Sequence, residues 1–260
     1  MTTFFDEVTR CVVESDAARG LDLLQHFNEP KETRLGLSKE GIDGHGGDDE
    51  IGARIWAALT TDLEALVRVG ILKWIEDVPV FVEGVDKDIT SDLTTRLIFE
   101  PLSKFTQAMV EKYPQFTAGD HEIKSFRRPV WRPSGAQPHW VFKSLDLPVA
   151  AGKPLLLVPK YWARPRLLMS GGRYYGTSVL SYVQNERAVR DRRTGKLIKE
   201  PKRLLRERDE FERGQDTVVR VTREAKNKRE DLLATFRAFV DERYERLDPA
   251  EIDRRLRRRP

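Results

Sequence analysis

Carboxylates and a lysine between residues 88 and 124 have a spacing suited to chemistry on a phosphodiester. Asp88 and Asp92 lie in the stretch DKDITSD, and Glu122 stands two residues before Lys124. Two carboxylates can hold Mg²⁺ while a lysine orients the attacking water or supports negative charge at the phosphate. We therefore predict Asp92, Glu122 and Lys124 as catalytic residues. The predicted ligands of a Mg²⁺ cofactor are Asp88, Asp92 and Glu122.

This spacing resembles that of metal-dependent nucleases of the PD-(D/E)xK type. Those enzymes place an aspartate at the end of one strand and an acidic residue two positions before a lysine on the next. In this sequence a whole predicted helix separates Asp92 from Glu122, where that fold keeps a short hairpin. The alternative interpretation is that Asp92 caps the following helix and that Glu122 and Lys124 lie on a solvated loop.

A second candidate site is the basic and aromatic segment YWARPRLLMSGGRYYG, residues 161–176. Aromatic rings can stack on bases, while arginine guanidinium groups can contact phosphates with two parallel hydrogen bonds. The predicted nucleic-acid-binding residues are Lys160, Tyr161, Trp162, Arg164, Arg166, Arg173, Tyr174 and Tyr175. The same pattern is also typical of an amphipathic rim around a core, and Lys160 could be an ordinary lysine at a strand end.

Charge is distributed unevenly along the chain. The 260 residues have a net charge of +4, but residues 1–151 sum to −8 and residues 152–260 sum to +12. A basic region of this kind attracts phosphate or an acidic protein surface. We therefore expect nucleic acid as a partner, with a protein partner in a larger complex as the alternative.

The composition also excludes several classes of site. Cys11 is the only cysteine, so an internal disulfide and a zinc site with several thiolates are both excluded. The sequence contains neither H-E-x-x-H nor G-x-S-x-G, which disfavours the metalloprotease and esterase patterns. Apolar runs are short, so we expect no contact with a membrane and a cytoplasmic location.

Hydrophobic periodicity predicts helices in the first half of the chain. Residues 51–70 repeat apolar side chains at helical spacing and end at Gly70. Residues 71–84 are rich in branched and aromatic residues, which predicts one or two short strands. A second helix should follow to Met109, kinked or restarted at Pro101.

The later segments indicate loops, a buried strand and charged helices. Dense prolines from Tyr113 to Pro148 predict loops with one short strand around residues 139–142. The run PLLLV at residues 154–158 predicts a strand buried on both faces. From Tyr174 onward the sequence predicts helices rich in charge, with a turn at residues 194–196.

Three stretches together resemble a family of uncharacterised bacterial proteins associated with mobile elements and phage-defence loci. They are VEGVDKDITSDLTTRLI followed by KFTQ at residues 104–107, PLLLVPK at residues 154–160, and RYYGTSVLSYVQ at residues 173–184. The resemblance spans roughly residues 35–190 and implies a role in defence. It assigns no catalytic residue, and Glu122 and Lys124 are not part of its pattern.

These observations predict an α+β protein that is mostly helical, with a small sheet and a charged helical C-terminal region. We expect an acidic core domain over residues 1–170 and a basic helical region over residues 171–260. The predicted function is nucleic-acid binding in a bacterial antiphage defence system, as a component resembling a metal-dependent nuclease. The alternatives are a non-catalytic adaptor subunit and a protein whose charged C-terminal helices form an oligomer interface.

Overall fold

The computed structural model groups the chain into two units of dense contacts. The structure describes residues 1–27, 30–34, 48–118, 122–135, 137–162, 167–243, 248, 250 and 254. The first unit draws chiefly on Met1–Trp56 and Lys87–Arg166, and the second on Ala57–Asp86 and Leu167–Tyr244. Residues 57–86 therefore group with the later part of the chain, whereas the sequence analysis kept them in the N-terminal domain. The domain boundary at residue 170 stays a prediction.

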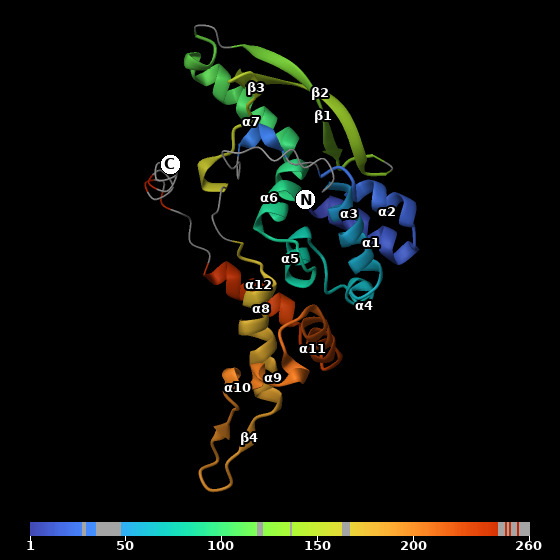
Figure 1. The fold of residues 1–260 in the computed structure, drawn as a ribbon, viewed down its shortest axis with the longest axis vertical. Helices are drawn as coiled ribbons and strands as arrows, with labels where there is room; N and C mark the ends of the chain where they lie inside the picture. The colour runs from blue at the N-terminus through green and yellow to red at the C-terminus, as the bar shows by residue number, and fades with distance from the viewer. Residues whose placement is uncertain are drawn as a thin grey trace. The chain divides into compact units, whose positions relative to one another are not determined.

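The first unit combines helices with a long antiparallel hairpin (Figure 1). Its helices are α1 (Thr2–Glu14), α2 (Ala17–Leu24), α6 (Lys87–Leu97) and α7 (Phe99–Lys112), together with most of α3 (Asp48–Thr60). Its 3-10 turns are η1 (Lys31–Thr33), η3 (Pro114–Phe116) and η4 (Lys160–Trp162). Its strands are β1 (Ile123–Arg132), β2 (His139–Ala150) and β3 (Lys153–Pro154).

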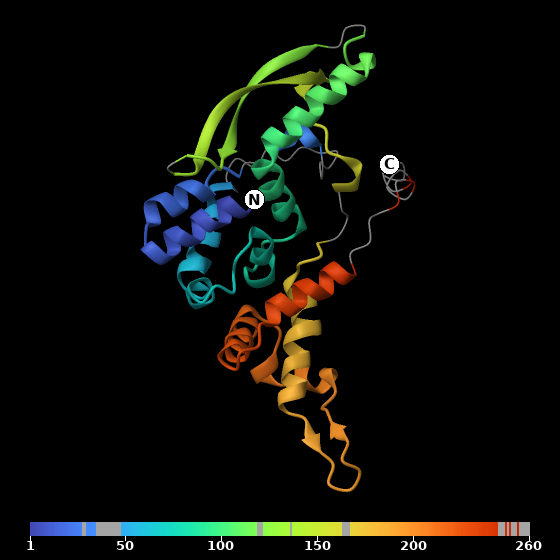
Figure 2. The ribbon, with the colours of Figure 1, turned by 180° about the vertical axis from the view of Figure 1, so that it is seen from behind.

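Helix α7 covers one face of the hairpin formed by β1 and β2 (Figures 1 and 2). The two strands pair from Ile123 opposite Pro148 to Arg132 opposite His139. Alternate side chains of each strand face the helix, as the two-residue period of a strand requires. The buried core between them consists of Phe99, Leu102, Val130, Leu145, Leu147 and Leu156.

The hairpin is longer than the sequence predicted, so the expectation of loops with one short strand was wrong. Pro129 lies inside β1, which is an edge strand in the order β1-β2-β3. Proline is tolerated there because its missing N–H leaves no ladder hydrogen bond unmade. The strand expected at residues 154–158 is also absent: only Lys153–Pro154 form β3, and Leu156 is the one buried residue of that run.

The other end of the hairpin packs against α1 and α2. Phe4 meets Trp131 edge to face, with ring centroids 5.0 Å apart. The Trp140 indole N–H donates to the Leu23 carbonyl at 3.0 Å, and the Arg19 guanidinium donates to the Pro138 carbonyl at 2.8 Å. These contacts fix the orientation of β1 within the first unit.

The second unit is helical and carries one small hairpin (Figure 2). Its first elements are α4 (Glu64–Arg68), η2 (Ile75–Asp77) and α5 (Val78–Phe81). They are followed by α8 (Gly171–Tyr174), the π-helical turn η5 (Tyr175–Val179), α9 (Leu180–Glu186), β4 (Val189–Arg190) and β5 (Leu197–Ile198). Its last elements are α10 (Lys202–Arg206), η6 (Asp209–Phe211), α11 (Gln215–Asn227) and α12 (Leu232–Glu242).

The strands predicted within residues 71–84 are helical turns in the structure, so that prediction was wrong. Asp77 is fully buried, and its carboxylate accepts the backbone N–H groups of Lys73 and Trp74, both at 3.1 Å. These hydrogen bonds stabilise the 3-10 turn η2. Pro79 then occupies the first turn of α5, where a helix needs no N–H donor.

Several other expectations are confirmed. The protein is α+β and mostly helical. Residues 51–68 are helical in α3 and α4 apart from a break at residues 61–63, and Gly70 follows with φ +66°. The helix before Pro101 restarts at Phe99, and residues 194–196 lie within the short connection between β4 and β5, whose turn is at residues 192–194. Among the described helices, none is long and apolar enough to span a membrane.

Candidate anion-binding site

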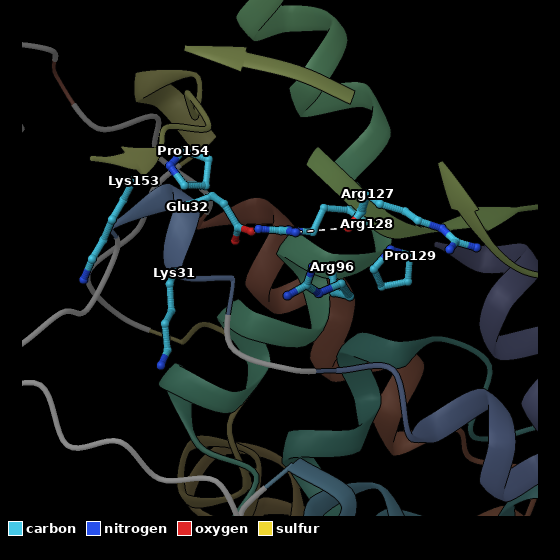
Figure 3. Close-up of a pocket in the computed structure, with 8 residues that line it drawn as sticks. All are labelled: Lys31, Glu32, Arg96, Arg127, Arg128, Pro129, Lys153 and Pro154. Atoms are coloured by element: carbon cyan, nitrogen blue, oxygen red, sulfur yellow. Dashed lines mark hydrogen bonds and ion pairs between the residues drawn. The ribbon is translucent and has the colours of Figure 1, made fainter. Parts of the chain in front are cut away.

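A pocket in the first unit is lined mainly by cationic side chains (Figure 3). Its volume is about 380 Å³, which is within the usual range for small-ligand sites. The lining residues are Lys31, Glu32, Arg96, Arg127, Arg128, Pro129, Lys153 and Pro154. Five of these residues are basic and one is acidic. The pocket therefore favours an anion.

Elements that are distant in sequence position these residues. Lys31 and Glu32 belong to η1, and the Glu32 carbonyl accepts the Leu156 N–H at 2.8 Å. This bond attaches η1 to the chain that follows β3, which carries Lys153. Arg96 comes from the last turn of α6, whereas Arg127 and Arg128 come from the edge strand β1. Packing of η1 and α6 beside the free edge of the hairpin thus assembles the site.

Glu32 and Arg128 form the central ion pair of the pocket. The Arg128 Nε donates to Glu32 Oε1 at 2.5 Å, and the Glu32 side chain is only 7 % exposed. Figure 3 shows Arg128 reaching toward Glu32, with Arg96 beside this pair and with Lys31 and Lys153 on the other side of Glu32. The Glu32 carboxylate therefore pairs with one of the five basic lining residues.

Aromatic rings hold two of the pocket arginines in place. The Arg96 guanidinium lies over the Phe99 ring at 5.2 Å, and Arg96 as a whole is 4 % exposed. The Arg128 guanidinium lies 5.6 Å from the Phe126 ring centroid. Such contacts restrict the positions of the two guanidinium groups. A guanidinium that is already held in position loses less conformational entropy on binding an anion than a freely rotating one does.

One lining arginine, Arg127, also contacts an exposed phenylalanine of β2 that does not line the pocket. Arg127 points away from Glu32 in Figure 3, and its guanidinium lies 5.2 Å from the centroid of the Phe142 ring. Phe142 is 58 % exposed although it stands in the middle of β2, opposite Pro129. An exposed ring of this kind can stack on a planar group.

The structure does not bring the predicted catalytic residues into a metal site. Asp92 lies in the middle of α6, so it does not cap that helix, and Asp88 lies in its first turn. Glu122 and Lys124 are exposed and pair with each other at 2.5 Å. Within the described part of the chain, no three His, Cys, Asp or Glu side chains are grouped so that they could hold a metal ion.

Two of the predicted nucleic-acid-binding residues are core residues. Tyr174 is fully buried and its hydroxyl is hydrogen bonded to Thr222 Oγ1 at 2.8 Å. Tyr175 is 2 % exposed and its hydroxyl donates to the Phe211 carbonyl at 2.6 Å. Neither ring face is accessible to a base, so the interpretation as an amphipathic rim around a core is correct for both tyrosines. Burial also raises the pKa of each hydroxyl.

The other predicted binding residues that the structure describes belong to two different units. Lys160 and Trp162 lie in η4 of the first unit, where Trp162 is 59 % exposed. Arg173 is exposed on α8 of the second unit. Arg164, Arg166 and the Tyr161 side chain lie outside the described residues.

Sequence reasoning missed the pocket because it lies in the acidic part of the chain. The adjacent arginines Arg127 and Arg128 were the one local sign of the pocket in the sequence. Nothing in the sequence relates Lys31 to Arg96 or Lys153, which are more than 50 residues apart.

Comparison with known proteins identifies the family of the first part of the chain. Residues 1–170 match the model of a family described as "Domain of unknown function (DUF8370)". The chain belongs to this family. No curated protein and no solved structure matches it. The matched residues include every lining residue of the pocket, and the expected membership of an uncharacterised family is confirmed.

Proposed function

We propose that the protein binds nucleic acid and that the cationic pocket of the first unit takes a backbone phosphate. The observation that carries the proposal is the set of five basic side chains around a pocket of about 380 Å³ that contains one carboxylate. Phosphate contacts from Lys and Arg supply most of the affinity in nucleic-acid binding, since they release condensed counterions. The pocket arginines can also bind phosphate with two parallel hydrogen bonds.

The exposed ring that Arg127 contacts favours single-stranded nucleic acid. Phe142 does not line the pocket itself, but Arg127 both lines the pocket and contacts the Phe142 ring. Bases of a single strand are unstacked and can lie on an aromatic side chain, whereas bases of a duplex are stacked on each other. We therefore propose that a phosphate occupies the pocket while an adjacent base stacks on Phe142.

Hydrolysis, a Mg²⁺ cofactor and a role in antiphage defence are further proposals, and they are based on the sequence alone. If the protein hydrolyses nucleic acid, Asp92, Glu122 and Lys124 would act on the strand that the pocket holds, and the protein would work in the cytoplasm. A non-catalytic adaptor that binds nucleic acid or an acidic partner protein would use the same pocket for binding alone. Incubation of the bound oligonucleotide with Mg²⁺, Mn²⁺ or a chelator separates these roles.

The binding proposal is tested by removing two exposed pocket lysines. We expect the double variant Lys31→Ala/Lys153→Ala to weaken binding of a labelled single-stranded oligonucleotide by about 5- to 30-fold, because two lost contacts of about 0.5–1 kcal/mol each sum to 1–2 kcal/mol. The slope of log affinity against log salt should fall by about 1.4, since each single-strand phosphate contact contributes about 0.7.

The matched control is Lys104→Ala/Lys112→Ala, which removes the same charge from α7 of the same unit. Fluorescence anisotropy at several salt concentrations reports both the affinity and the slope. Equal effects of the two double variants, or no binding by the wild-type protein, would contradict the proposal.

A further inference from the structure

A small hairpin in the second unit, here called the basic arm, comprises residues 189–199. Its strands β4 and β5 pair with Val189 opposite Ile198 and with Arg190 opposite Leu197. Figures 1 and 2 show that it projects away from α9 and α10 of its own unit. At its base, Lys199 Nζ donates to Asn185 Oδ1 at 2.6 Å, which ties the arm to α9.

The tip of the arm is an ordered turn. One carboxylate oxygen of Asp191 accepts the backbone N–H groups of Arg193 at 3.0 Å and Thr194 at 2.6 Å. Gly195 closes the turn with φ +69°, a conformation that costs glycine little. These hydrogen bonds lower the pKa of the Asp191 carboxyl, with the backbone bond from Thr194 as the largest cause. The only acidic side chain of the arm is therefore occupied by the turn itself.

The arm carries a high density of positive charge. Its basic residues are Arg190, Arg192, Arg193, Lys196 and Lys199. Arg192, Arg193 and Lys196 are exposed, and none of the acidic side chains described by the structure forms an ion pair with them. A short ribbon with an excess of four positive charges is attracted to a polyanion.

Apolar side chains are exposed on the same ribbon. Val189 is 67 % exposed, and Leu197 and Ile198 are each 57 % exposed. Burial of exposed aliphatic surface is favourable, so an arm with three such side chains is stabilised by a partner that covers it. A partner that covers the arm therefore has to offer both negative charge and an apolar surface.

We propose that the basic arm inserts into the major groove of duplex DNA. That groove is about 12 Å wide and admits a two-stranded β-ribbon, with phosphates on both walls for the basic residues. Thymine methyl groups on its floor supply the apolar contact for Val189 and Ile198, which pair across the ribbon and therefore share one of its faces. The major groove of duplex RNA is too narrow for side chains to read, so the arm distinguishes the two duplexes. This inference does not depend on the phosphate pocket, which lies in the other unit.

The charge of the arm is tested with Arg192→Ala/Arg193→Ala in the full chain. We expect weaker binding of a duplex DNA of about 25 base pairs, and a fall of about 1.8 in the salt slope because two contacts contribute about 0.9 each. Binding of a single strand of the same length should be unchanged. The control Arg203→Ala/Arg223→Ala removes equal charge from α10 and α11 and should leave duplex binding nearly unchanged.

The apolar contact is tested with Val189→Ser/Ile198→Ser, which keeps every charge and changes only the face that these two residues share. We expect weaker duplex binding with an unchanged salt slope. Replacing thymidine by deoxyuridine in the duplex removes the methyl groups. This replacement should weaken duplex binding by the wild-type protein but not by this variant. Equal losses on duplex and single strand would overturn groove insertion, as would arm variants that match the control. Groove insertion would also be overturned if the arm variants lost binding to an acidic protein while their duplex binding stayed unchanged. These outcomes can be read independently of the pocket variants and their effect on single-strand binding.

Discussion

Replacing Glu32 by glutamine should make the protein bind single-stranded nucleic acid more tightly. Glu32 is the one carboxylate among the described residues that line the pocket, and its side chain is 7 % exposed. It accepts a hydrogen bond from Arg128 Nε at 2.5 Å. Glutamine has nearly the same shape and keeps an oxygen that can accept this bond. The substitution therefore removes a negative charge while the pocket keeps its form.

The size of the effect follows from the distance between the two anions. We take a phosphate bound on the far side of the Arg128 guanidinium to be about 6 Å from the Glu32 carboxylate, which is the span of two charge-assisted hydrogen bonds of about 2.8 Å each. Two unit charges about 6 Å apart repel by about 3 kcal/mol at an effective dielectric constant of about 20, and by about 1.4 kcal/mol at about 40. The openness of the pocket to water favours the smaller value, so the dissociation constant of Glu32→Gln should fall about tenfold.

Fluorescence anisotropy with a labelled single-stranded oligonucleotide measures this change. Glu111→Gln, an exposed carboxylate on α7, is the matched control for the loss of one negative charge. Thermal unfolding of both variants checks that the first unit is intact. If Glu32→Gln folds normally and binds no tighter than Glu111→Gln, the phosphate does not occupy this pocket.

Three further outcomes test other parts of the structure. Arg237→Ala should lower the free energy of unfolding of the second unit by about 3–5 kcal/mol, as measured by urea denaturation, because it leaves the buried Asp77 carboxylate without its guanidinium partner. A loss below about 1 kcal/mol would show that this ion pair does not stabilise the unit. Phe142→Ala should weaken single-strand binding by about 1–3 kcal/mol if a base stacks there; its duplex binding should change little. The hydrogen bond from Arg10 holds the pKa of Glu7 below 4.5, so Glu7 contributes stability above that pH which is lost as the pH falls further. Glu7→Gln should flatten the pH dependence of unfolding below 4.5, and an unchanged curve would refute this assignment.

Local patterns predicted the helices well and the strands poorly. The helix at residues 51–70 and the restart near Pro101 follow from apolar spacing and proline geometry, which act within a few residues. Residues 71–84 have the composition of strands but form η2 and α5, because the Asp77 carboxylate binds two backbone N–H groups. The long hairpin was hidden by Pro129, which is acceptable only because β1 is an edge strand.

The sequence by itself determined the fold class and the uneven distribution of charge, since both depend on composition and local periodicity. It also located the turn of the basic arm. Tertiary structure alone decided which charged residues act together. It buried Tyr174 and Tyr175, which the sequence offered as base-stacking residues, and it brought Lys31, Arg96 and Arg128 to one pocket. The physical reason is that electrostatic attraction for an anion depends on distances in space, and packing sets those distances between residues far apart in the chain.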